Sequence, residues 1–549
     1  MRRHRRVLVA ALAAVSVAVA GTVAITLSGP AAVAGERHVD QGKPHPGAAS
    51  VIGGYRHLVV IYEENHSFDN LYGTWGKVNG HRVEGLANAA RTSTQVAQNG
   101  EPYGCLLQND VNLTSPPLPT TCTDPAHAVP ASAFTNRPFR IDDEIPAEAT
   151  TCPAPGVSAP NGVLNGSGLP GGCTRDLVHR FYQEQYQLDG GKQDRYVTGS
   201  DAVGLTMGVY DTRQLPIWRY LHSAGAPHYV IADHFFQAAF GGSFLNHQYL
   251  VAARAPVDTS GGADGAVHSV LDANAFPNKT YPLYTPTRAD VVDGQLTQAC
   301  GPAANPTVAC GDLAVNTIQP ASAPHAASGP QLPLVDDARY PNIGDRLSAA
   351  KVSWNWYSGG WNDAEAGHPG PLFQYHHQPL NYFAAYAPGQ PGRTHLRDET
   401  EFITAAQTGK LPTVSFVKPY GAENEHPGYA SEPDGSDHLV DLLTTITSGP
   451  QAHDTLVVVT YDEFGGQWDH VPPPGTGGTR GVHDAFGPGT RIPALVISSA
   501  LPHSGVDHTV YDTTSILATI ERGLRLAPLT RRDARVADLR PALRAAGQH

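Results

Sequence analysis

Two clusters of acidic and amide side chains follow directly after apolar segments of the chain. Residues 63–70 read EENHSFDN after the apolar run that ends at Tyr62, and residues 460–466 read TYDEFGG after the run that ends at Val459. Carboxylate and amide oxygens are hard ligands that suit a divalent cation. Acids also commonly cap helices, so either cluster alone fits a helix N-cap or a solvated turn equally well. Together they indicate a divalent metal site of unspecified identity, with ligands from two distant parts of the chain.

The segment 240–247, FGGSFLNH, presents a serine after two glycines. The glycines let the backbone turn sharply and approach an anion, and a helix that begins at Ser243 would favour phosphate at its N-terminus. A serine hydroxyl bound to a cation loses its proton more easily and becomes a nucleophile. The competing interpretation is a plain serine N-cap. Leu245 stands where a GxSxG elbow needs its second glycine, which disfavours a carboxylesterase triad.

Several histidines could assist cleavage of a phosphate ester. Such a site needs donors for the nonbridging oxygens and an acid for the leaving group, and imidazole serves both purposes near neutral pH. Taken singly, each histidine is more often an ordinary surface or core residue. The candidates are His127 in DPAH, the adjacent His376 and His377, and His426 in NEHP.

The elements that must position these residues are predicted by five apolar segments. These lie at residues 57–62, 229–232, 413–417, 456–460 and 492–497. Continuous apolar runs are typical of strands that are covered on both faces, as in a parallel sheet. Helical spacing near Pro216, at 439–446 and at 516–524 alternates with them. We therefore expect an α/β fold, a mainly parallel central sheet with helices on both faces, whose ligands bind beyond the carboxyl ends of the strands.

Two stretches rich in Pro and Gly interrupt this pattern, near residues 85–175 and 255–335, and they contain all six cysteines. We interpret them as long insertions in one catalytic domain, pinned by disulfides, because an even cysteine count in an exported chain favours disulfide bonds. The simplest pairing is sequential: Cys105 with Cys122, Cys152 with Cys173, and Cys300 with Cys310.

The N-terminus has the features of an export signal. Four arginines among the first six residues precede an apolar run at 7–27 and the small-residue triplet at 32–34. This pattern predicts a signal peptide at 1–34 for the Sec or twin-arginine route, although the run is also long enough for an uncleaved anchor. We divide the remainder into a flexible segment at 35–50, a catalytic domain at 51–535 and a C-terminal tail at 536–549.

The formal net charge of -13 argues against nucleic acid or an anionic membrane surface as an electrostatic partner. We expect a secreted protein without stable membrane insertion once its signal is cleaved.

Five ordered motifs together resemble one protein family. They are VVIYEENHSFD at 59–69, DPAH at 124–127, GGSFLNH at 241–247, YHHQP at 375–379 and TYDEFGGQWDHV at 460–471. From about residue 57 to residue 522, the chain is similar to the bacterial phosphoesterase family. That family contains secreted acid phosphatases and phospholipases C and is related to the alkaline phosphatase fold.

This resemblance implies roles for individual residues. The implied metal ligands are Glu64, Asn65, Ser243, Asp462 and Glu463, the implied catalytic residues are Ser243, His426 and His127, and the implied phosphate-binding residues are Asn246, His376 and His377. Serine in place of the threonine of some phosphocholine-type members favours the phosphatase branch.

The expected function is therefore that of a secreted metal-dependent phosphomonoesterase that forms a phosphoserine. The alternatives are a phospholipase C that cleaves phospholipid phosphodiesters at the same site, and a non-catalytic secreted binding protein on the same fold.

Overall fold

The computed structural model describes residues 50–91, 94–107, 119–144, 176–258, 277–286, 297, 309–311 and 313–548. The predicted signal peptide at 1–34 and all but the last residue of the segment at 35–50 lie outside these residues. Within the described part of the chain, no helix is both long and apolar enough to span a bilayer.

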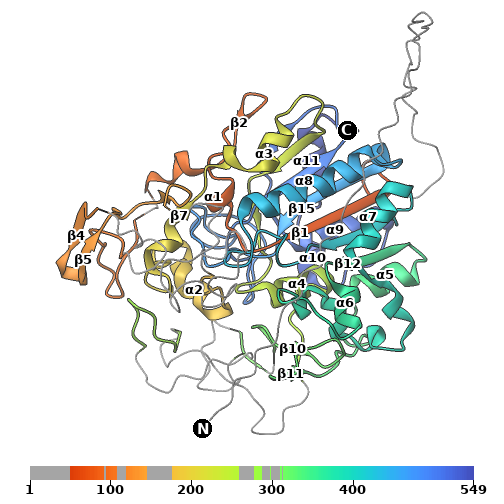
Figure 1. Ribbon diagram of the computed structural model, residues 1–549, viewed down its shortest axis with the longest axis horizontal. Coiled ribbons are helices and arrows are strands. Elements are labelled where there is room, and N and C mark those ends of the chain that lie inside the picture. The colour runs from red at the N-terminus through yellow and green to blue at the C-terminus, as the bar shows by residue number, and fades with distance from the viewer. Residues whose placement is uncertain are drawn as a thin grey trace, which may run out of the picture. The chain divides into compact units, whose positions relative to one another are not determined.

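A central sheet of eight described strands organises the protein (Figure 1). From one edge to the other the strands are β13 (Leu396–Asp398), β12 (Trp354–Ser358), β14 (Val414–Lys418), β1 (His57–Glu63), β15 (Thr455–Tyr461), β16 (Ala494–Ser498), β8 (His228–Ala232) and β17 (Gly505–Asp507). Neighbours pair in parallel except that β16 runs antiparallel to both β15 and β8. The predicted mainly parallel α/β sheet is confirmed, and all five predicted strands belong to it.

The strand β1 shows why the apolar runs do not alternate with polar residues. It lies between β14 and β15, and its residues from Leu58 to Ile61 are fully buried on both faces of the sheet. Burial of each such aliphatic side chain contributes about 1.5–3 kcal/mol. A strand covered on both faces therefore reads as continuously apolar.

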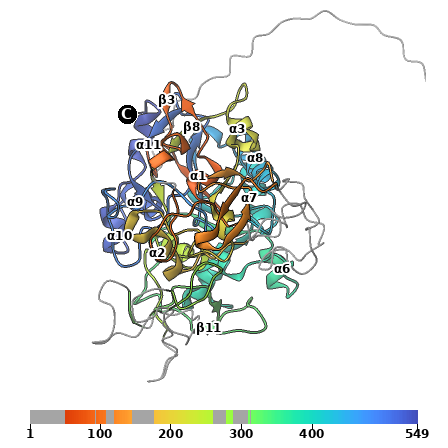
Figure 2. The same cartoon turned by 90° about the vertical axis from the view of Figure 1, so that its left-hand side faces the viewer.

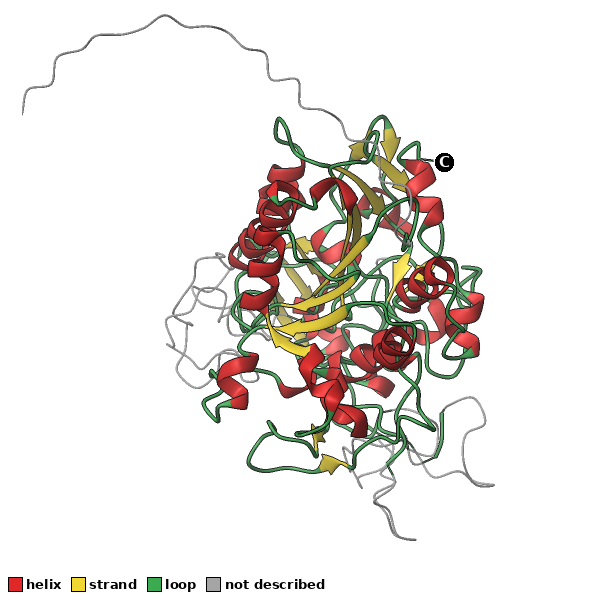
Figure 3. Cartoon of the chain, turned by 90° about the vertical axis from the view of Figure 1, so that its right-hand side faces the viewer, coloured by secondary structure: helices red, strands yellow, loops and turns green. Residues whose placement is uncertain are grey.

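Helices cover both faces of the sheet (Figures 2 and 3). Figure 2 shows α3 (Pro216–Leu221) and α8 (Glu432–Ser448) on one side, with α9 (Thr514–Leu524) and α10 (Arg531–Arg535) on the other. The residues predicted as a C-terminal tail include α11 (Arg540–Ala545), which packs against β17 and β8.

The start of the helix α8 and its buried face both follow from its sequence. Ser431 is its N-cap and accepts a hydrogen bond from the Asp434 amide, with a proline in the first turn. Its buried stripe of Leu439, Leu442, Leu443 and Ile446 follows the helical spacing seen in the sequence.

The described parts of the insertions contain short two-stranded sheets. One pairs β4 (Cys122–Asp124) with β5 (Val129–Ser132), and the disulfide Cys105–Cys122, with its Cα atoms 6.0 Å apart, confirms the first predicted cysteine pair. Cys310 is also disulfide-bonded. Cys152, Cys173 and Cys300 lie outside the described residues.

Candidate active site

Parallel register brings the two acidic clusters together. The last residue pair of β1 and β15 is Glu63 with Tyr461, so that Glu64 and Asp462 follow side by side at the carboxyl edge of the sheet. On the other side of β1, the strand β14 ends at Lys418, which points its ammonium into the same region. The Asn65 amide and the Asp462 carboxylate, which are 397 residues apart in sequence, thus belong to one cluster.

Asn65 directs its side chain at the serine. Its φ of 61° lies in the left-handed region, which asparagine tolerates better than most residues. Its amide nitrogen Nδ2 lies 2.9 Å from Nε2 of His426, so its Oδ1 faces Ser243 and accepts a hydrogen bond of 3.3 Å from Oγ. The backbone N–H of Asn65 donates to Oδ1 of Asp462 at 3.3 Å.

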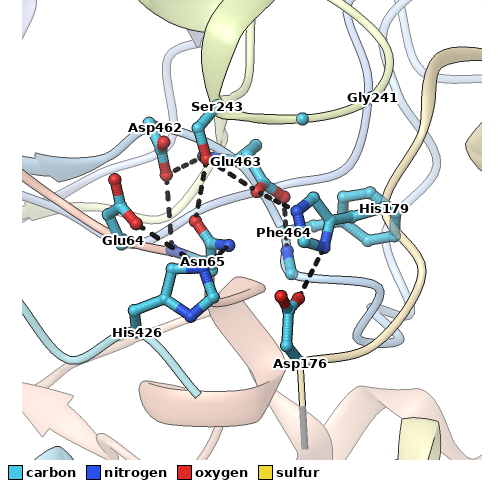
Figure 4. A network of polar contacts seen from close by, with 12 residues as sticks. Glu64, Asn65, Asp176, His179, Gly241, Ser243, His426, Asp462, Glu463 and Phe464 are labelled. Carbon is cyan, nitrogen blue, oxygen red and sulfur yellow. Dashed lines mark hydrogen bonds and ion pairs between the residues drawn. The ribbon is translucent and has the colours of Figure 1, made fainter. Parts of the chain in front are cut away.

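Ser243 is the first residue of α4 (Ser243–Ala252), as the sequence predicts for a helix beginning there. Its Oγ donates to Oδ1 of Asn65 and to Oε1 of Glu463, both at 3.3 Å, and the side chain also hydrogen-bonds to Asp462 (Figure 4). Gly242 is the N-cap of α4, and its position leaves the serine side chain free of any capping bond. The hydroxyl therefore faces three prospective oxygen ligands and not the helix backbone.

The two glycines before Ser243 are required by close packing. A Cβ at Gly241, where φ is 88°, would lie 2.5 Å from the backbone nitrogen of Phe181, and one at Gly242 would lie 3.1 Å from Cδ2 of His179. At Gly241 a side chain would meet both the strained φ and the clash, whereas at Gly242 a Cβ would only press on His179. Glu184 fixes the loop further, since its Oε2 accepts the Gly241 N–H at 2.6 Å.

Asn246 supports this loop and makes no described contact with the acidic cluster. Its Oδ1 accepts the backbone N–H of Ala239 at 2.9 Å, and its Nδ2 donates to the carbonyls of Ala239, Gly241 and Gly242. The resemblance implies a phosphate-binding role, but the geometry uses the whole amide to hold the backbone that precedes the serine.

His377 and Lys418 hold Glu64. Nε2 of His377 contacts Oε1 of Glu64, and Nζ of Lys418 lies 2.8 Å from the same oxygen. Burial by itself raises the pKa of Glu64, but its contacts with His377 and Lys418 outweigh burial and hold that pKa well below its usual range. His376 lies beside them, and the ligand atoms of Glu64, His376 and His377 all fall within 4.8 Å of one another.

The cluster carries more negative than positive charge. Glu64, Asp462 and Glu463 are all buried, and Lys418 is the one buried ammonium among their described contacts. Burial raises the pKa of Asp462 to about 7, and burial together with Asp462 raises the pKa of Glu463 well above its usual range.

Unbalanced buried charge of this kind is costly. Oδ2 of Asp462 and Nε2 of His247 have no hydrogen-bond partner among the described residues. The raised pKa values of Asp462 and Glu463 relieve part of this cost by protonation; when all three carboxylates are ionised, they exceed the one ammonium by two charges, which a single divalent cation would balance.

The structure does not bring His127 to this cluster. Its Nδ1 lies 2.7 Å from Oδ2 of Asp124, and its ring packs against Tyr103. It lies between β4 and β5, which Figure 1 shows apart from the large sheet. None of the contacts described for His127 is with a residue of the acidic cluster, so the position implied for it is not supported.

His179, which the sequence analysis did not name, lies beside the acidic cluster. It too follows an aspartate at a spacing of three, Asp176, with Nδ1 3.4 Å from that carboxylate and 2.6 Å from the Leu177 carbonyl. Its Nε2 lies 3.5 Å from Oε1 of Glu463 (Figure 4). Sequence reasoning missed it, although DLVH at 176–179 shares the Asp-x-x-His spacing of DPAH and precedes a helix.

His426 is placed beside Asn65 and 3.6 Å from Oε2 of Glu64. Its Nδ1 lies 2.8 Å from the Pro427 carbonyl, and Tyr429 stacks on its ring. Burial lowers the pKa of His426 to about 3, so the neutral imidazole donates from Nδ1 and accepts the Asn65 amide at Nε2. In this state His426 orients Asn65.

A serine at a helix N-terminus, among buried carboxylates at the carboxyl edge of an α/β sheet, is compatible with phosphoester chemistry. The sequence profile of the Phosphoesterase family matches residues 55–527, and the chain belongs to this family. It is a hydrolase acting on phosphoester bonds, which confirms the prediction of an enzyme over a non-catalytic binding protein.

Two relatives illustrate the similarity. Phospholipase C B of Mycobacterium tuberculosis (strain CDC 1551 / Oshkosh) is 25% identical over 532 residues, covering 90% of this chain and 78% of the relative. Non-hemolytic phospholipase C of Burkholderia pseudomallei (strain K96243) is 30% identical over 220 residues, covering 33% of this chain and 29% of the relative. A solved structure from Vibrio parahaemolyticus, described as a protein in the alkaline phosphatase superfamily, matches at a TM-score of 0.22 and 11% identity, covering 37% of this chain and 52% of that one.

Proposed function

We propose that this protein is a secreted, metal-dependent phosphomonoesterase that works through Ser243 and a phosphoserine intermediate, with residues 51–535 as its catalytic domain. The observation that carries the proposal is the hydroxyl of Ser243, directed at Asn65 and Glu463 inside a buried cluster of three carboxyl groups and one ammonium. Phospholipase C activity is the second candidate, favoured by the match to relatives named phospholipase C along most of the chain.

The residues that would hold a divalent cation are Glu64, Asn65, Ser243, Asp462 and Glu463. When bound, the cation supplies positive charge that favours the ionised serine and the charge on the transferring phosphoryl group. Lys418 keeps Glu64 in place and balances part of the same charge.

The chain's own residues account for the remaining steps. The free amides at the start of α4 favour a phosphate next to Ser243. Ser243 loses its proton and attacks phosphorus, the bond to the leaving oxygen breaks and that oxygen takes up a proton, and water then hydrolyses the phosphoserine to free phosphate and the serine hydroxyl. His179 lies against Gly242 and beside Glu463, and its Nδ1 faces the Leu177 carbonyl, so its Nε2 can accept a proton and pass it to the leaving oxygen.

The two candidate activities differ in their need for a lipid surface. We expect the protein to hydrolyse a soluble monoester such as p-nitrophenyl phosphate at a higher kcat/KM than it hydrolyses phosphatidylcholine in vesicles. Release of nitrophenol and of phosphocholine measures the two. Hydrolysis of vesicle lipid with negligible monoester turnover would establish phospholipase C as the function instead.

Replacement of His179 should distinguish its role from that of His127. We expect His179→Asn to lower kcat by about 10²- to 10⁴-fold on an alkyl phosphate, the range for a lost general acid or base. On p-nitrophenyl phosphate the loss should be smaller, because nitrophenolate leaves without a proton. His127→Asn is the matched control, from the same Asp-x-x-His pattern, and should stay near the parental rate. Equal losses for both leaving groups would contradict a proton-transfer role.

A further inference from the structure

A second group of metal-binding side chains lies at the carboxyl ends of β8 and β17. In the parallel pairing of these strands, Ala232 is opposite Asp507, so that Asp233 and His508 follow side by side. The Asp233 N–H donates to the Asp507 carbonyl at 3.2 Å, which continues the register past the last pair. His234, the next residue along, adds a second imidazole.

The three side chains converge on one point. Nδ1 of His234 and Nδ1 of His508 each lie 2.9 Å from the same carboxylate oxygen, Oδ1 of Asp233. The three atoms all lie within 4.8 Å of one another. Asp233 is fully buried, whereas the side chain of His508 is 57% exposed, so the group opens to solvent on the His508 side.

The backbone around the group is held by other bonds. Oδ2 of Asp233 accepts the Glu84 N–H at 2.7 Å, which leaves Oδ1 pointing at the imidazoles. The His234 carbonyl accepts the Tyr511 N–H at 2.9 Å. Asp507 fixes the loop that carries His508, because it accepts from the Thr509 backbone and hydroxyl and from the Tyr511 hydroxyl.

The one buried guanidinium described beside Asp233 is already matched by other carboxylates. Arg491 donates from Nη1 to the backbone carbonyl of Asp233, while its Nε and Nη2 pair with Asp469 at 3.1 Å and Asp69 at 3.0 Å. Oδ1 of Asp233 is therefore left to the two imidazoles.

We propose that Asp233, His234 and His508 form a binding site for a divalent transition metal of the zinc class. Two imidazole nitrogens and one carboxylate oxygen are donors that zinc and cobalt favour, whereas calcium and magnesium prefer all-oxygen sets. Tetrahedral coordination with bonds of about 2.0–2.1 Å puts ligand atoms about 3.3 Å apart. Each imidazole nitrogen lies 2.9 Å from Oδ1 of Asp233, a little closer than that, and the three ligand atoms all lie within 4.8 Å of one another. Solvent takes the fourth position on the exposed side. The Glu84 bond supplies the outer support that orients a ligand.

The alternative arrangement contains no metal. In it, both imidazoles carry a proton on Nδ1 and donate it to Oδ1 of Asp233. The site shares no residue with the catalytic cluster, so the proposal does not depend on the proposed function.

The experiment counts metal ions in the full-length protein. All proteins carry Asp462→Asn, which is chosen to weaken the catalytic site. Three of them are compared: the Asp462→Asn background, the background with His508→Ala, and the background with His453→Ala. His453 is an exposed histidine without a described side-chain contact and serves as the matched control. Each protein is titrated with Co²⁺, followed by visible absorption, and its Zn²⁺ content is measured after dialysis.

We expect the background and the His453 control to bind one equivalent of Co²⁺ with a tetrahedral spectrum beyond whatever the weakened catalytic cluster retains, and His508→Ala to lose that equivalent. His234→Ala should lose the same equivalent, so that the result does not depend on one variant. In the parental chain, His508→Ala should leave phosphoester hydrolysis unchanged. Equal Co²⁺ binding and equal Zn²⁺ content in all variants would overturn the proposal in favour of hydrogen bonds alone, and so would no binding in the background chain.

Discussion

Ser243→Ala is expected to lower turnover by several orders of magnitude while the fold, and most of the bound metal, stay in place. The hydroxyl lies among Asn65, Asp462 and Glu463, and it is one prospective ligand of several. Residues that act as one catalytic unit fail together when the attacking group is removed. The carboxylates from β1 and β15 should still hold the cation. The measurement is kcat per folded, metal-loaded molecule, with a search for phosphoserine at this position after an acid quench.

A matched serine provides the control for this experiment. Ser431 is a fully buried N-cap whose side chain accepts the Asp434 amide at 3.0 Å. Its replacement by alanine should cost about 1 kcal/mol of stability with turnover per folded molecule unchanged. Ser243 makes no capping bond, so Ser243→Ala should lose activity and keep its stability, whereas Ser431→Ala should lose stability and keep its activity. Retention of more than about a tenth of parental turnover by Ser243→Ala would be too much for a lost nucleophile.

Local apolar pattern was sufficient to predict the centre of the sheet and failed at its edges. The strands β1 and β15 are continuously aliphatic and stand out from the sequence. The strand β12 reads WNWYS, in which large aromatics and an asparagine replace the aliphatic run, and it was not predicted. Its burial comes from contacts that sequence periodicity does not record, such as Trp356 stacked on Phe416 of the neighbouring strand.

Some residues of the candidate site were likewise predictable from the sequence, and others were not. The acidic clusters and Ser243 were predictable because each directly follows a strand or begins a helix, where the fold class itself fixes the location. Lys418 was not, because a lysine at the end of an apolar run reads as a solvated charge, and only the position of β14 beside β1 buries it against Glu64. His127 and His179 share one local spacing, and only tertiary packing distinguishes them.

Glu64→Gln is expected to weaken metal binding by at least about 10-fold and to lower turnover in proportion to the metal lost, since even outer-shell changes cost 10- to 100-fold in affinity. The amide keeps the shape of the side chain and removes the negative charge of Glu64, which its contacts with His377 and Lys418 favour and which would balance part of a divalent cation's charge. Asp462→Asn should act in the same direction. Metal content after dialysis and kcat at rising metal concentration are the measurements. Added metal should restore part of the turnover of Glu64→Gln, whereas Ser243→Ala should gain nothing.

The neighbouring Glu63 makes this prediction specific to the position. Both glutamates are buried, but successive residues of a strand point to opposite faces, and Glu63 lies with Glu425 on the far side of β1 from the cluster. Burial, then Glu425, raises the pKa of Glu63 well above its usual range, which favours the neutral acid that glutamine imitates. Glu63→Gln should therefore keep its metal and its activity. If both variants lost metal equally, the loss would come from damage to the strand, and if Glu64→Gln kept full metal and full turnover, Glu64 would not be a ligand.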